Sequence, residues 1–255
     1  MTFKLIPGTG LILSLSILTF ALLGCAGDRA ARQRQAQAQQ DLGRSLLAEG
    51  NYTASLRKLH EAASIDPENP QIQNDLALAY REMEMYPEAI AHFKKALELN
   101  PDFSEAYNNM GTVYLLLEKW DLAISCFENA LKNSLYPTPH FAYNNLGIAY
   151  FHKGEYRKAA ESYKKAVQLQ PSYSRAYHHM GIALEALNKY EKAIESYYKS
   201  IESAPENPAS YFRLGRLYLK LNETTLAVKN LRKTIQLDKQ DRYAPRARRL
   251  LSEIE

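Results

Sequence analysis

Two consecutive stretches of the chain repeat one pattern: residues 140–173 read HFAYNNLGIAYFHKGEYRKAAESYKKAVQLQPSY, and residues 174–207 read SRAYHHMGIALEALNKYEKAIESYYKSIESAPEN. Each stretch has a glycine near the middle of its first half, Gly147 or Gly181. Apolar and aromatic residues recur around that glycine and again in the second half at helical spacing, which predicts two amphipathic helices per stretch. A residue without a large side chain lets the two helices of such a hairpin approach closely.

The same pattern extends over most of the chain. Its central small residue recurs at steps of 34, 34, 36, 34 and 34 residues, and a proline closes each of the first five units at the same steps. The sixth unit has Lys239 where the proline would fall. A constant period of this length indicates a stacked array of helical hairpins. The small residues are Gly43, Ala77, Gly111, Gly147, Gly181 and Gly215; the prolines are Pro67, Pro101, Pro137, Pro171 and Pro205.

This pattern resembles the tetratricopeptide repeat (TPR), whose period is 34 residues. The resemblance implies an all-α fold, a right-handed superhelix of six helix-turn-helix repeats followed by a capping helix over 242–255. Gly50 and Gly154 are expected at turns inside hairpins. In the second helices we expect Phe93, Phe127, Tyr163, Tyr197 and Leu231 to fill the gap to the next hairpin. The repeats are expected at 36–69, 70–103, 104–139, 140–173, 174–207 and 208–241.

The N-terminus, residues 1–24, has the features of an export signal. Lys4 precedes an apolar run over 11–23 that is too short to span a bilayer comfortably, which needs about 20 apolar residues. The run ends in Leu22-Leu23-Gly24-Cys25, which resembles the bacterial lipobox. The resemblance implies cleavage before Cys25 and attachment of diacylglycerol and an N-acyl chain to it. The alternative is an uncleaved short anchor with an accidental cysteine.

The acyl chains would hold the protein stably to a membrane, because two or more chains are needed for stable anchoring. Ala26 follows the lipidated position, where an aspartate favours the inner membrane, so the chain is expected at the outer membrane, facing the periplasm. Residues 25–35 are expected to form the lipidated cysteine and a solvated tether. No other cofactor is expected.

Composition and motifs point away from catalysis and from nucleic acid. The net charge is +4 in a mixed background of acidic and basic residues. No phosphate-binding glycine loop, nucleophile elbow or zinc-protease helix occurs, so no catalytic residue and no small-molecule substrate is predicted. His178 and His179 are adjacent on a helix and point about 100° apart, which disfavours a shared metal ion. Cys126 is expected to be a small buried hydrophobe.

In the TPR family the first helices line a concave groove that holds a partner protein. Two positions before each central small residue, every unit has a polar residue, and these residues, which we call the polar ladder, change from acidic to basic along the chain. Asn is also common at this position in TPR sequences generally. An apolar floor runs through the middle repeats; the alternative is that these side chains only contact one another. The predicted groove residues are Asp75, Leu78, Asn109, Leu115, Asn145, Ile148, Phe151, His179, Ile182 and Arg213.

The third repeat is two residues too long, and its extra residues precede Leu135-Tyr136-Pro137, with Asn145-Leu146-Gly147 following shortly after. Together with the lipobox and six repeats, this resembles the PilF/PilW family of type IV pilus biogenesis lipoproteins. The resemblance implies binding of the secretin subunit and support of its assembly in the outer membrane. The alternative partner is another envelope protein, such as a peptidoglycan enzyme. The cations Arg242, Arg246, Arg248 and Arg249 are expected on a solvated face of the capping helix, with acidic lipid headgroups as the alternative contact.

Overall fold

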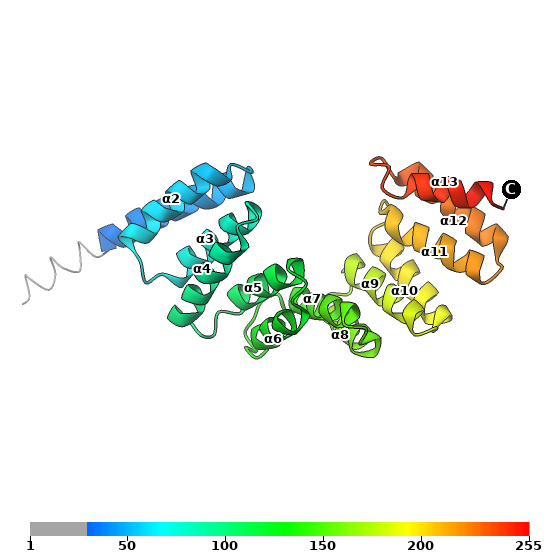
Figure 1. The fold of residues 1–255 in the computed structure, drawn as a ribbon, viewed down its shortest axis with the longest axis horizontal. Coiled ribbons are helices and arrows are strands. Elements are labelled where there is room, and N and C mark those ends of the chain that lie inside the picture. The colour runs from blue at the N-terminus through cyan, green and yellow to red at the C-terminus, as the bar shows by residue number, and fades with distance from the viewer. Residues whose placement is uncertain (1–29, 255) are drawn as a thin grey trace, which may run out of the picture. The chain divides into compact units, whose positions relative to one another are not determined.

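The computed structural model describes residues 30–254. Helices are the regular secondary structure of this part of the chain, and they are connected by short turns. The described helices fall into two units, one ending at Pro101 and one beginning at Asp102. Within each unit, successive helices pack against each other as hairpins (Figure 1). No helix among the described residues is long and apolar enough to cross a membrane.

The N-terminal unit contains two hairpins. The first pairs a helix over 30–48 with α2 (Tyr52–Ile65), and the second pairs α3 (Pro70–Glu82) with α4 (Tyr86–Leu99). The tether predicted from the sequence overlaps the first helix, because residues 30–35 are already helical and mostly exposed. The lipobox and Cys25 lie outside the described residues.

The C-terminal unit contains four hairpins and a final helix. Each of the predicted repeats in this unit contains one helix pair, and α13 packs against α12 at the end of the chain. Ala247 and Leu251 of α13 are buried against Phe212 and Leu231, so α13 covers the last hairpin. The helices are α5 (Ser104–Leu116), α6 (Trp120–Ala130), α7 (Pro139–His152), α8 (Tyr156–Leu169), α9 (Ser174–Ala186), α10 (Tyr190–Ser203), α11 (Pro208–Lys220), α12 (Thr224–Leu237) and α13 (Ala244–Ser252).

The turn inside each hairpin is tight because one residue adopts a left-handed backbone conformation. Gly50 and Gly154 do so with φ of 79° and 78°, as the sequence predicts for these two turns. Glycine is the residue best suited to this conformation, since it has no Cβ to clash with the following carbonyl. The other hairpin turns use Glu84, Glu118, Asn188 and Asn222.

The close approach of the two helices in a hairpin depends on a small central residue, which is Ala77 in the α3–α4 hairpin and glycine in the other hairpins described. A Cβ at Gly181 would lie 2.5 Å from Cε1 of Tyr197, far inside van der Waals contact. Tyr197 is fully buried and also packs in a cluster with Leu214 and Leu217 of the next hairpin. The prediction that it fills the gap to the next hairpin is therefore confirmed, and the same ring occupies the space left by the glycine of its own hairpin.

The interruption of the third repeat forms the connection between α6 and α7. Tyr136 is buried and packs with Ala130 and Ala142, which anchors the extra residues to both helices. Leu135 beside it is 86% exposed. Cys126 on α6 is buried and free, and burial raises the pKa of its thiol to about 12. The prediction that Cys126 is a small buried residue is confirmed.

Candidate functional site

The C-terminal unit has a hollow of about 500 Å³ formed mainly by α7, α9 and α11, which we call the inner groove. Its apolar residues Ile148, Phe151 and Ile182 are half-buried. Ile148 and Phe151 also pack against the buried Tyr163, so they contact their neighbours while one side remains open. Five predicted groove residues meet here. The lining consists of Ile148, Phe151, His152, Tyr163, His179, Ile182, Glu185, Ala186 and Arg213.

A second hollow of about 800 Å³ adjoins the inner groove and shares Ile148 and His179 with it; we call it the polar trough. It is lined by Asn145 and Arg175 and reaches the connection between α12 and α13 at Lys239. Amide, guanidinium and ammonium groups therefore flank the apolar floor of the inner groove. A protein segment lying along both hollows would find apolar contacts first and, beyond them, hydrogen-bond donors together with the carboxylates of Glu206 and Asp238.

Polar side chains tie neighbouring first helices together beneath these hollows. Asn145 Nδ2 on α7 donates to Asn108 Oδ1 on α5 at 3.2 Å. His179 Nδ1 on α9 lies 3.1 Å from Asn144 Oδ1 on α7, a hydrogen-bond distance. In each case a residue two positions before the central glycine bonds the residue three positions before the glycine of the preceding repeat. We call this contact a rung.

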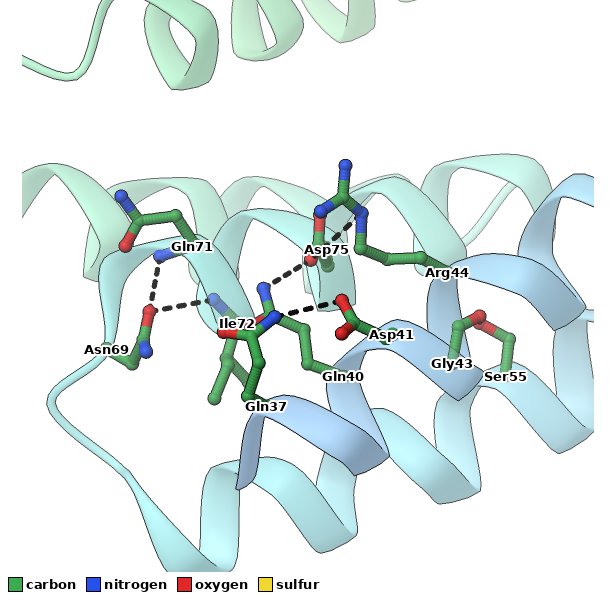
Figure 2. A network of polar contacts seen from close by, with 10 residues as sticks. All are labelled: Gln37, Gln40, Asp41, Gly43, Arg44, Ser55, Asn69, Gln71, Ile72 and Asp75. Atoms are coloured by element: carbon green, nitrogen blue, oxygen red, sulfur yellow. Dashed lines mark hydrogen bonds and ion pairs between the residues drawn. The ribbon is translucent and has the colours of Figure 1, made fainter. Parts of the chain in front are cut away.

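The N-terminal unit contains the same rung with different chemistry. Gln40 Nε2 donates to Asp75 Oδ2 at 2.7 Å, and Arg44 Nε lies 3.9 Å from the same oxygen (Figure 2). Gln37 donates to the exposed Asp41 nearby. The polar ladder predicted to hold a partner is thus largely occupied by contacts between hairpins. Among the described ladder residues, Arg213 is the one whose side chain has no hydrogen bond or ion pair.

Burial sets the ionisation of the rungs. Burial lowers the pKa of His178 to about 3 and that of His179 to about 4. The neighbouring His179 and Arg213 lower the pKa of His178 further, and Arg175 and Arg213 do the same for His179. Both rings are therefore neutral at physiological pH. Burial also raises the pKa of the Asp75 carboxyl, while the hydrogen bond from Gln40 opposes the shift. Desolvation disfavours the charged form in all three cases.

Arg213 supplies the inner groove with a cationic side chain that has no hydrogen-bond or ion-pair partner among the described residues. The carboxylate of Glu185 on the same lining accepts a hydrogen bond from the Tyr197 hydroxyl, so that acid is held by the core. Arg213 keeps all its donors available for a ligand. The inner groove therefore combines an apolar floor with one free guanidinium, which suits an apolar protein segment carrying an acceptor or a carboxylate.

The other predicted groove residues lie elsewhere. Asp75 is buried and Leu78 half-buried on α3 in the N-terminal unit. Asn109 and Leu115 are half-buried on α5, outside the lining of both hollows. Sequence reasoning missed the structural role of Asn144, although a signal was present. Consecutive polar pairs precede the small residue in five repeats: Gln40-Asp41, Asn74-Asp75, Asn108-Asn109, Asn144-Asn145 and His178-His179.

Repeated helical hairpins, closely packed at a central small residue and hollowed along their first helices, define a helical-repeat protein. Models of the tetratricopeptide repeat match residues 46–91, 102–172, 142–206 and 179–254, and a TPR repeat model matches 77–117. The chain belongs to the tetratricopeptide repeat family, whose members bind other proteins. Comparison with curated protein sequences finds no match.

Solved structures share this fold. The structure of PilF from Pseudomonas aeruginosa has a TM-score of 0.76 and 20% identity, over 88% of this chain and 99% of that one. PilW, described as a widely conserved type IV pilus biogenesis factor, also has a TM-score of 0.76 and 20% identity, over 85% and 98% of the two chains. MamA from Desulfovibrio magneticus RS-1 has a TM-score of 0.59 and 25% identity, over 68% and 97%. At this level of identity the likeness to PilF and PilW is one of fold.

Proposed function

We propose that this TPR protein acts as a pilotin: a lipid-anchored scaffold that binds the secretin subunit of a type IV pilus and supports its assembly in the outer membrane. The observation that carries the proposal is the inner groove, an open apolar floor with the free Arg213 beside it. An exposed apolar patch of this kind marks an interaction site on a protein surface. No chemical step is required of such a protein.

The fold of PilF and PilW over most of both chains supports the choice of partner. The interrupted third repeat and the lipobox resemblance point the same way. Within the described residues, the extra segment is built into the fold through the buried Tyr136 and is not a loose insertion. The proposed partner is therefore an envelope protein with an apolar segment that fits the inner groove.

The proposed anchor determines how the groove would work. Acyl chains on Cys25 would confine the protein to the membrane surface, where its partner also resides. Confinement raises the effective concentration of one binding site for another without any new contact. Modest affinity in the groove would then suffice, since covering one apolar side chain stabilises a complex by roughly 1.5–3 kcal/mol.

The proposal is tested by the heat-resistant secretin multimer in a strain that lacks this gene. We expect most of the multimer to be lost, and the wild-type gene to restore it. The double variant Ile148→Asp with Phe151→Asp should fail to restore it, because two charges in the apolar floor oppose an apolar ligand. A matched control is Leu116→Asp, which alters an exposed apolar residue outside the groove lining.

Two further measurements make the result interpretable. Circular dichroism of the groove double variant must retain the helical signal of the wild type. The Cys25→Ala variant should lose palmitate labelling and restore the multimer poorly. Full multimers in the deletion strain would end the secretin assignment, and normal palmitate labelling of Cys25→Ala would end the anchor assignment.

A further inference from the structure

A third hollow lies between the second helices α10 and α12, apart from the residues that line the inner groove. It has a volume of about 820 Å³, and we call it the outer trough. Tyr198 and Ile201 of α10 form one wall, and Leu226 and Val228 of α12 lie opposite. Tyr198 and Leu226 are 46% and 36% exposed, so large apolar groups at this hollow remain open to solvent.

The charge of the outer trough has one sign. Lys229, Arg232 and Lys233 of α12 line it, and none of its lining residues is acidic. Neither α12 nor the adjoining α13 contains an aspartate or glutamate within its helical bounds. Lys229 has no hydrogen-bond or ion-pair partner among the described residues. The cationic side chains therefore lie along the α12 wall of the outer trough, beside its apolar residues.

The preceding repeat provides an internal comparison, because a hollow of about 500 Å³ between α8 and α10 is lined in part by the equivalent residues 34 positions earlier. Glu195 there occupies the place of Lys229, and Lys199 occupies the place of Lys233. Glu195 and Lys199 form an ion pair of 2.8 Å across one helical turn. In the outer trough the same two places carry like charges one turn apart, an arrangement that destabilises an isolated helix.

We propose that the outer trough binds an acidic amphipathic helix of a partner protein. The apolar face of that helix would cover Ile201, Leu226 and Val228, and its carboxylates would lie along the α12 wall beside Lys229 and Lys233. The stretch from Leu226 to Gln236 measures about 15 Å at 1.5 Å per residue, which matches about three turns of a ligand helix. Helices that lie in grooves bind through apolar anchors at this spacing.

A helix fits this surface better than a flat membrane does. Ile201 and Val228 are half-buried and recessed in a hollow, so inserted side chains can reach them and a planar layer of headgroups cannot. The lysines of α12 supply the charge complementarity that orients the ligand. The proposal does not depend on the inner groove, whose lining shares no residue with the outer trough.

The test uses the full chain and a synthetic 18-residue helical peptide with leucines on one face and glutamates on the other. A matched peptide carries lysine in place of each glutamate. Fluorescence anisotropy should show binding of the glutamate peptide that weakens with salt, and at least about tenfold weaker binding of the lysine peptide. Equal binding of the two peptides would overturn the proposal.

The decisive variant is Lys229→Glu, which recreates the ion pair found one repeat earlier. A glutamate four residues before Lys233 is the favourable order on a helix, so the fold should be retained. We expect about a tenfold loss of affinity for the glutamate peptide, with unchanged circular dichroism. The converse variant, Glu195→Lys, should increase peptide binding by creating a second pair of lysines one helical turn apart, at positions 195 and 199.

Two controls distinguish the outer trough from the inner groove and from a lipid-binding surface. Ile148→Asp alters the inner groove and should leave affinity for the glutamate peptide unchanged, which separates this proposal from the pilotin proposal. Vesicles of phosphatidylglycerol and of phosphatidylcholine test the lipid alternative. The helix-binding role would be refuted if Lys229→Glu left the affinity for the glutamate peptide unchanged. It would also be refuted if the wild type bound phosphatidylglycerol vesicles but no peptide, and Lys229→Glu abolished the vesicle binding.

Discussion

The rungs of the two units join the same positions of the repeat but use different side chains, a carboxylate in the N-terminal unit and a neutral imidazole in the C-terminal unit. In the N-terminal unit the buried Asp75 accepts from Gln40 and lies near Arg44 (Figure 2). In the C-terminal unit the neutral His179 contacts the buried Asn144, and one repeat later Arg213 is left without a partner. The same repeat position can thus stabilise a stack or remain available to a ligand, depending on the residue one repeat before it.

This comparison also predicts how each rung responds to pH. The two histidines have lowered pKa values, so the unfolded chain takes up protons before the folded chain does as the pH falls below about 6.5. Their contribution to stability is present above that pH and is lost on acidification. Asp75 has a raised pKa, so its contribution is present at low pH and is lost as the pH rises through its folded-state pKa.

The largest effect is expected from replacing the adjacent buried histidines of the C-terminal unit, His178 and His179. In the wild type each buried histidine can steepen the loss of unfolding free energy by up to about 1.4 kcal/mol per pH unit between about pH 6.5 and 4. His178→Asn with His179→Asn retains an amide donor near Ser210 and Asn144 and removes the titration. Denaturant unfolding followed by circular dichroism at several pH values measures the slope.

The double variant should be less stable than the wild type at pH 7.5, because two buried rings are lost, and should lose less stability on acidification. His92 in the N-terminal unit and His140 in the C-terminal unit also have pKa values lowered by burial and remain in both proteins, so they contribute equally to each. An unchanged slope would show that His178 and His179 are not buried in the neutral form.

A smaller effect of opposite sign is expected in the N-terminal unit. Asp75→Asn keeps an oxygen that can accept from Gln40 and removes a buried charge. We expect a gain of order 1 kcal/mol in unfolding free energy at pH 7, since a neutral group in a buried site avoids the cost of desolvating a charge. The gain should vanish below about pH 4, where protonation of the carboxyl makes it neutral in the wild type as well.

The matched variant for this measurement is Asp41→Asn. Asp41 lies in the same network and is exposed, with Gln37 as its donor. Its replacement should leave the unfolding free energy nearly unchanged both at pH 7 and below about pH 4, as expected for a solvated side chain. A loss of stability at pH 7 in Asp75→Asn would mean that the ionised carboxylate, together with Arg44, stabilises the rung.

The fold was predictable because its determinants recur at a fixed period. The small residues at Gly147, Gly181 and their equivalents mark the close approach of two helices, a local requirement that recurs at a regular interval. A glycine marks the turn only at Gly50 and Gly154, and the other hairpin turns use Glu or Asn. The buried Tyr136 in the interrupted repeat could not be predicted in this way, since its burial depends on where two particular helices leave space.

The candidate site was predictable only in part. The apolar floor of Ile148, Phe151 and Ile182 could be predicted because apolar side chains recur along the first helices of the middle repeats. The rungs depend on contacts between repeats, and a single repeat does not contain both partners. Likewise, the charge of the outer trough emerges only when Lys229 is compared with Glu195 in the preceding hairpin.

The central claim, that the inner groove binds a protein partner, is tested most directly by photo-crosslinking in cells. A photoreactive amino acid at Ala186, an exposed residue of the groove lining, should give an adduct that contains the secretin subunit. The same amino acid at the exposed Glu191, which is not part of that lining, should give none. Adducts from position 191 without adducts from position 186 would contradict the account.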